Sequence, residues 1–221
     1  YDAGKIWAMG QFASSANLLE LIADTKRNRQ GIMPELMMFD CHACHSPMSK
    51  KDWSKDLARS PGQARINNSS LIMVQAIVRA AAPQHSSDIA KLVNQLHIAS
   101  TSPAANFAEV ERAANVLHAQ LNTVRKVVAT VPFNEQVLEK ILKDLVNMAA
   151  NNQYADFAGA EQAYMSISSV ANGLARKGNS RIAQTVNSKM DRLLKLLSND
   201  EAYDREAFQS ELLALKAAVG A

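Results

Sequence analysis

The sequence predicts an all-α fold, an antiparallel bundle of about seven helices with a long irregular loop. Apolar residues recur with the helical period of 3.6 through most of the chain, and strand-type alternation is almost absent. The composition is also helix-prone, because 48% of the 221 residues are hydrophobic while only 5% are aromatic. We therefore expect one generous domain, or two small ones, built from helices alone.

The bounds of the expected helices follow from the apolar period and from capping and breaking residues. Pro83 ends one helix and Gly178 stops another, while Ser102 followed by Pro103 is a typical helix start. We place helices at about 2–27, 69–82, 87–100, 103–128, 134–148, 154–177, 180–197 and from near 204 onward. The irregular stretch between the first two runs from Asn28 to about Ile66 and contains most of the breakers.

Two of these helices have apolar faces that can be specified residue by residue. The first helix is expected to bury Met9, Phe12, Ala16, Leu19 and Ala23. The helix opened by Pro103 is expected to bury Phe107, Val110, Ala114, Leu117, Leu121, Val124 and Val128.

The motif that carries chemistry is Cys41-His42-Ala43-Cys44-His45, in the middle of the irregular stretch. C-x-x-C-H is the attachment signature of c-type haem, in which each thiol adds to one vinyl group of the porphyrin. The adjoining histidine is then placed to ligate the iron on the proximal side. With two cysteines and five histidines in the chain, chance would produce the pattern in under about one such sequence in a thousand. We predict one haem c, held by Cys41 and Cys44 and ligated by His45.

Three other readings of the two cysteines fit the sequence less well. A thioredoxin-like C-x-x-C lies in a strand–helix context, and no strand pattern flanks this one. A structural zinc site needs four ligands, but His85, His97 and His118 are scattered along helices. A disulfide across two residues would be strained and would not require the following histidine.

Composition and charge limit where the chain works and what it binds. Haem is attached through thioethers on the outer face of the bacterial inner membrane, so the motif predicts a periplasmic or extracellular protein. The longest apolar runs are a handful of residues, which excludes a membrane span, and a net charge of +3 gives no argument for nucleic acid. The chain begins inside a helical pattern without Met, so we expect a mature or trimmed product, or the C-terminal piece of a longer protein.

The charges after the motif are mostly positive. Between Ser46 and Ile66 two carboxylates, Asp52 and Asp56, stand against five cations, Lys50, Lys51, Lys55, Arg59 and Arg65. Two interpretations stay open and are compatible: a solvated loop, or cations that face haem propionates or an acidic redox partner.

The segment from Pro34 to Met48, with its Phe-Asp-Cys-x-Ala-Cys-His-x-Pro-Met block, resembles the haem motif of a helical domain of bacterial multihaem c-type cytochromes. In that domain the block follows a first helix with a Gly-Gln pair, here Gly10-Gln11, and the stretch from Asp156 to Tyr164 resembles its C-terminal part. The resemblance implies an electron-transfer unit. The chain departs from the multihaem pattern in having a single C-x-x-C-H, so further haems would lie on other sequence or on a partner.

The ligand on the other side of the iron decides the function. Met48 is tethered to the proximal side and His42 points away, which leaves His97, His85, His118, or a methionine such as Met9 or Met73. If neighbouring helices are antiparallel, the helical rise per residue gives the height of each residue along the bundle. His97 should then lie at the height of Ile72, near the point where the irregular stretch re-enters the bundle. His85 and His118 fall together at the far end. We therefore expect His97 as the distal ligand, with a core histidine as the alternative.

Two histidine ligands favour electron transfer over enzymatic chemistry. We expect a redox partner protein, which includes other cytochromes or a multihaem complex, and the sequence leaves homo-oligomerisation open. The alternative is a haem-based sensor, or a small enzyme such as a peroxidase, with an open sixth position on the iron. A third class is an interaction protein. We divide the chain into a haem-binding region, 1–131, and a charge-balanced C-terminal helical region, 132–221, packed as one unit.

Overall fold

A computed structural model describes residues 2–24, 26, 66–101, 106–151, 153–154 and 156–220 of the chain. All elements in these ranges are helical, which confirms the predicted all-α bundle, and the eight α-helices among them correspond to the eight ranges placed from the sequence. They are α1 (Ala3–Ala23), α4 (Ser69–Ala81), the 3-10 turn η3 (Pro83–His85), α5 (Ser86–Thr101), α6 (Phe107–Thr130), α7 (Glu135–Ala150), α8 (Phe157–Arg176), α9 (Ser180–Leu196) and α10 (Arg205–Val219).

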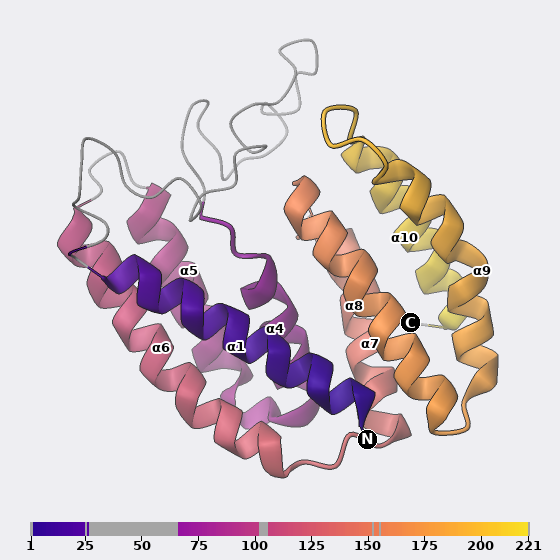
Figure 1. Ribbon diagram of the computed structural model, residues 1–221, viewed down its shortest axis with the longest axis horizontal. Helices are drawn as coiled ribbons and strands as arrows, with labels where there is room; N and C mark the ends of the chain where they lie inside the picture. The colour runs from indigo at the N-terminus through magenta and orange to yellow at the C-terminus, as the bar shows by residue number, and fades with distance from the viewer. Residues whose placement is uncertain are drawn as a thin grey trace.

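The helices run up and down between two ends of the bundle (Figure 1). We define the upper end of the bundle as the end at which α5, α7 and α9 finish. Helices α4, α6 and α8 begin at this same end. The opposite, lower end carries tight connections: η3 between α4 and α5, residues 131–134 between α6 and α7, and residues 177–179 between α8 and α9. The longer connections of the chain therefore leave from the upper end.

Side-chain caps set most of the helix starts. Asn134, Asp156, Asn179 and Asp204 each accept a hydrogen bond from a backbone N–H in the first turn of the helix that follows. These caps confirm the predicted starts near 134, 180 and 204, and they place the start of α8 at Phe157. Gly178, at φ 102°, adopts the left-handed conformation expected where α8 stops.

One predicted helix start is wrong. The helix expected from Pro103 begins at Phe107, because Asn106 is extended and its side chain accepts a hydrogen bond from Ala108 N. The Ser102-Pro103 pair lies outside the described residues. The first helix is also shorter than expected, since it ends at Ala23 and Asp24 is extended (φ −77°, ψ 93°).

The buried face of α1 differs from the predicted one. Phe12 and Leu19 are buried as expected, but Met9, Ala16 and Ala23 are only half-buried. The buried positions are Gly4, Ala8, Gln11, Phe12, Ser15, Leu19 and Ile22. Helix α1 packs against α4, α6 and α8 at once, and small residues allow this close approach. A Cβ on Gly4 would lie 2.6 Å from a methyl of Leu138, and one on Gly173 would lie 3.8 Å from the Cα of Gly4.

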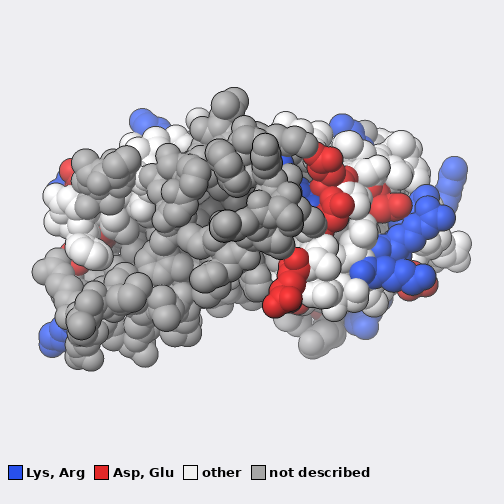
Figure 2. All heavy atoms as spheres, turned by 90° about the horizontal axis from the view of Figure 1, so that it is seen from above, with Lys and Arg blue, Asp and Glu red and all other residues white. Residues whose placement is uncertain are grey.

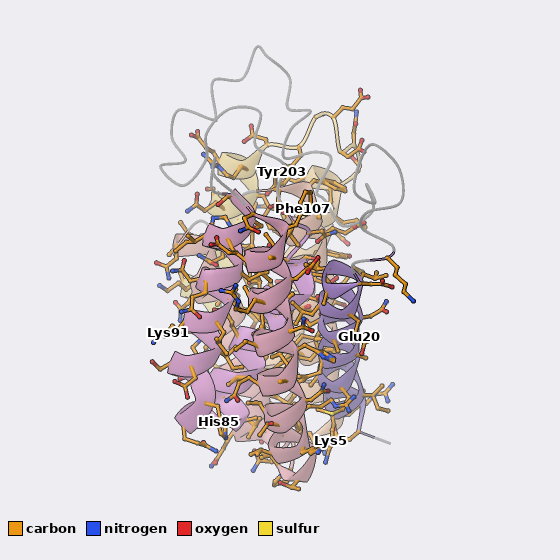
Figure 3. All side chains as sticks on the ribbon, turned by 90° about the vertical axis from the view of Figure 1, so that its left-hand side faces the viewer. Lys5, Glu20, His85, Lys91, Phe107 and Tyr203 are labelled. Carbon is orange, nitrogen blue, oxygen red and sulfur yellow. The ribbon has the colours of Figure 1, made fainter. Side chains whose placement is uncertain are left out.

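Helix α6 buries five of the seven residues predicted for its apolar face. Phe107 is 57% exposed and Val110 is half-buried, so these two predictions are wrong. Phe107 is the first residue of α6 and stands at the upper end (Figure 3), where α6 begins. The periodicity holds only from Ala114 onward, within the length that faces α1 and α5.

Contacts join the residues on the two sides of Pro132. Three polar contacts connect α1 or its cap to α8 or the residue after it: Trp7 Nε1–Ser166 Oγ at 3.3 Å, Gln162 Nε2–Gln11 Oε1 at 3.1 Å and Lys177 Nζ–Asp2 Oδ2 at 3.2 Å. An ion pair of 2.6 Å joins Arg79 of α4 to Asp144 of α7. The apolar core is continuous across both regions.

Candidate functional site

The residues of the C-x-x-C-H motif lie outside the described part of the chain. Cys41, Cys44 and His45 fall within residues 27–65, and so do the cations from Lys50 to Arg65. Two thiols followed at once by an imidazole are the donor set that covalent haem requires, so the chemistry of these residues fits the group. The helices on either side of this segment meet it at the upper end of the bundle, where α1 finishes and α4 begins (Figure 1).

His97 lies in the last turns of α5, four residues before its end at Thr101. Its backbone carbonyl accepts hydrogen bonds from Ser100 Oγ at 3.0 Å and Thr101 Oγ1 at 2.7 Å. The side chain is half-buried. His97 therefore lies toward the upper end, where α1 finishes and α4 begins, and its role as an iron ligand stays a prediction.

His85 lies at the other end of the bundle. It is the last residue of η3, in the connection between α4 and α5 (Figure 3). The helical length of α5, 16 residues, separates it from the upper end, a rise of about 24 Å at 1.5 Å per residue. His85 therefore lies at the far end of the bundle, as predicted from the sequence.

His118 is not level with His85, contrary to expectation. It lies in the middle of α6, with Nε2 at 3.2 Å from Glu20 Oε1 and 3.1 Å from Asn122 Nδ2, and Glu20 is three residues before the end of α1. The error follows from the helix start, because α6 begins four residues later than predicted and His118 is about 6 Å nearer the upper end. Its Nε2 atom is already engaged by two polar side chains.

The two methionines named as possible iron ligands, Met73 and Met9, differ in how deeply they are buried. Met73 of α4 is completely buried within the apolar core, where an iron ligand would need the haem inside that core. Met9 of α1 is half-buried. Met48 and His42 lie outside the described residues.

The structure brings together two sequence stretches that carry the resemblance to multihaem cytochromes. Gln11 of the Gly-Gln pair accepts a hydrogen bond from Gln162, which belongs to the 156–164 stretch. Asp156, itself 8% exposed, caps α8 by accepting from Gly159 N at 2.7 Å. A Cβ on Gly159 would lie 2.8 Å from Asp156 Oδ1, which explains a glycine there. The resemblance itself stays a prediction.

Sequence reasoning did not single out two tyrosines near the start of α8, the buried Tyr154 and the half-buried Tyr203. Tyr154 donates a hydrogen bond of 2.7 Å to the carbonyl of Leu145, and Tyr203 donates one of 3.0 Å to the carbonyl of Tyr154. Burial raises the pKa of both phenols, so both stay neutral donors. The ring of Tyr203 contacts Phe157 and Phe208 edge-on, with ring centroids 5.9 Å apart in each pair. The signal available in the sequence is only that large aromatic side chains are scarce in this chain.

Within the described ranges, no three side chains of His, Cys, Asp or Glu are grouped closely enough to hold a metal ion. No helix among those described is sufficiently long and apolar to cross a membrane. The chain matches no protein-family model, no curated protein sequence and no solved structure.

Proposed function

We propose that the chain is a c-type cytochrome that carries one covalently bound haem and transfers electrons outside the cytoplasm. The observation that carries the proposal is the C-x-x-C-H motif, Cys41 to His45, which uses both cysteines of the chain. A bound haem would supply reversible one-electron chemistry at its iron. In this proposal Cys41 and Cys44 anchor the porphyrin, and His45 ligates the iron and helps to set its potential.

The distal ligand in this proposal is His97. Its place toward the upper end supports the assignment, because α1 and α4, which flank the motif-bearing segment, finish and begin at that same end. His85 is at the lower end, and the Nε2 atom of His118 is held by Glu20 and Asn122. Two imidazoles on the iron give a low-spin haem of relatively low potential, which suits electron transfer to a redox partner protein.

The covalent bond is tested by extraction. Acid acetone should leave the haem on the protein, and pyridine in alkali should give the c-type haemochrome band. Cys41→Ser and Cys44→Ser should each leave one thioether and displace that band, and the double variant should release its haem. Haem that extracts freely from the unaltered chain would overturn the proposal, and so would a chain that matures in a c-type host without haem.

The distal assignment is tested by spectroscopy on three matched variants. His97→Ala should convert the haem to high-spin iron that binds CO readily, whereas His85→Ala and His118→Ala should leave the low-spin spectrum unchanged. An unchanged spectrum in His97→Ala would move the assignment to another residue. Unaltered protein that is already high-spin would instead favour a sensor or a peroxidase with an open sixth position.

A further inference from the structure

The methionine sulfurs of the described residues differ widely in their access to solvent. Met165, in the middle of α8, is 45% exposed. Met73, Met148 and Met190 are 0%, 5% and 7% exposed. Met9 is half-buried and packs against the core. The other methionines lie outside the described residues: Met33, Met37, Met38 and Met48. Met165 is therefore the most exposed methionine in the part of the chain that the structure describes.

Met165 stands among polar residues on the outer side of α8. Its neighbours on the helix surface, three and four positions away in the sequence, are Glu161, Gln162, Ser168 and Ser169. Glu161 is exposed and the other three are half-buried. Helix α8 is described along its whole length, and Met165 is its only exposed large apolar side chain. An oxygen atom added to this sulfur would therefore be solvated and would lie beside polar groups.

An added oxygen would be disruptive at the buried methionines. The sulfur of Met148 lies 3.5 Å from the hydroxyl of Tyr154, and both side chains are buried. Met73 is completely buried in the apolar core. A sulfoxide at either position would place a polar group inside this core, which is unfavourable unless the oxygen accepts a hydrogen bond. The fold thus shields these sulfurs and leaves that of Met165 accessible.

We propose that Met165 is a reversible oxidation site, at which hydrogen peroxide converts the thioether to a sulfoxide while the bundle stays folded. The sulfur lone pair attacks one peroxide oxygen, and an S–O bond forms as the O–O bond breaks. The proton of the transferred oxygen passes to the departing hydroxide, which leaves as water, so the sulfur is oxidised and the peroxide is reduced. Methionine sulfoxide reductases, one for each sulfoxide epimer, use a dithiol to restore the thioether. This proposal does not depend on the haem.

The charge of the protein does not decide which sulfur hydrogen peroxide reaches. Seen from above, Lys and Arg side chains gather on the side of the molecule formed by α9 and α10 (Figure 2). An anionic oxidant would be attracted to that side, whereas hydrogen peroxide is uncharged. The rate at which it oxidises each methionine should therefore follow the exposure of the sulfur.

The test treats the full, folded chain with hydrogen peroxide, stops the reaction with catalase at intervals, and locates sulfoxides by mass spectrometry of proteolytic peptides. Met165 should be oxidised at least about tenfold faster than each of the three buried methionines. In the chain unfolded by urea all four should react at similar rates, because the fold no longer shields any of them. The reductases should remove the oxygen from Met165. The oxidised protein should keep its circular dichroism spectrum and melt within about 2 °C of the untreated protein.

Two variants of conserved volume complete the test. Met165→Leu should leave the slow oxidation of the buried methionines unchanged, because they do not depend on prior oxidation of Met165. The matched control Met190→Leu, which alters a buried methionine, should leave the fast oxidation of Met165 unchanged. Similar rates at Met165 and at the buried methionines of the folded chain would overturn the proposal. Oxidation of Met165 that unfolds the bundle, or a sulfoxide there that neither reductase removes, would also contradict it.

Discussion

The helices before Pro132 and those after it are packed by different means. Helix α1 has no charged residue between Lys5 and Glu20 and is surrounded by α4, α6 and α8, with polar groups inside its contacts. Ser15 and Ser70 share a buried hydrogen bond of 3.1 Å, and Gln11 bonds to Gln162. The helices after Pro132 begin at side-chain caps, as α1 and α6 do, but they bury regular apolar faces. The first arrangement depends on specific long-range partners, and the second depends mainly on local sequence.

The largest effects are expected from removing a core aromatic residue in each region. Phe12 of α1 and Phe208 of α10 are each 1% exposed. Substitution by Ala should lower the free energy of unfolding by about 3–5 kcal/mol in either case, through lost burial and the cavity that remains. If the proposed haem belongs to the first region, folded Phe208→Ala should keep the haem spectrum of the unaltered chain. A changed spectrum in Phe208→Ala would show that the two regions are divided wrongly.

A smaller effect, with a defined pH dependence, is expected at the Arg79–Asp144 ion pair. Burial raises the pKa of Asp144, and Arg79 partly offsets this shift. Because the folded-state pKa is the higher one, ionising Asp144 costs stability as the pH rises through it. Without Arg79 this pKa rises further, so Arg79→Met should lower the free energy of unfolding by about 1–2 kcal/mol at neutral pH. The loss should shrink as the pH falls toward about 4.

The control for that variant is Lys177→Met, which breaks the more exposed pair with Asp2. It should change the free energy of unfolding by less than about 1 kcal/mol, because surface ion pairs contribute little. Urea titrations of both variants across the pH range would check the comparison. A loss in Arg79→Met that stays constant with pH would show that Asp144 is not the group responsible.

The smallest effect distinguishes the outer and inner surfaces of α1 and α8. A Cβ on Gly10 would meet nothing within 4 Å, whereas one on Gly173 would lie 3.2 Å from a methyl of Leu138. Gly10→Ala should therefore stabilise the protein by about 0.5–1 kcal/mol, since alanine has the higher helix propensity. Gly173→Ala should gain less or destabilise. Equal gains in thermal melting would mean that Leu138 of α7 does not approach Gly173 of α8 as closely as the structure indicates.

The same contrast explains which parts of the fold could be predicted. The caps at Asn134 and Asp204 act within one turn, so sequence alone locates them. The face of α1 depends on three neighbouring helices, and the apolar period therefore selected Met9 and Ala16 where Ala8 and Ser15 are buried. Phe107 fits the period of α6 but stands at its first turn, where packing against α1 and α5 is not yet continuous.

The candidate site divides in a similar way. Cys41, Cys44 and His45 form a contiguous motif, so their chemistry can be inferred from the sequence without a fold. The distal ligand has to come from elsewhere in the fold, and its level depends on where each helix begins. The late start of α6 at Phe107 moved His118 away from the level of His85 and beside Glu20. A four-residue error in one helix start is thus enough to misplace a candidate ligand.

The contacts between α1 and α8 bear on what would happen if the chain were cut between the two regions. The connection between α6 and α7 is short and lies at the lower end, while the contacts of Trp7, Gln11 and Arg79 cross between the two regions elsewhere. A break between Val131 and Pro132 would leave the buried Phe133 attached to α7. The two pieces should then reassemble without a covalent link, as a split protein in which each half supplies the surface that the other folds against.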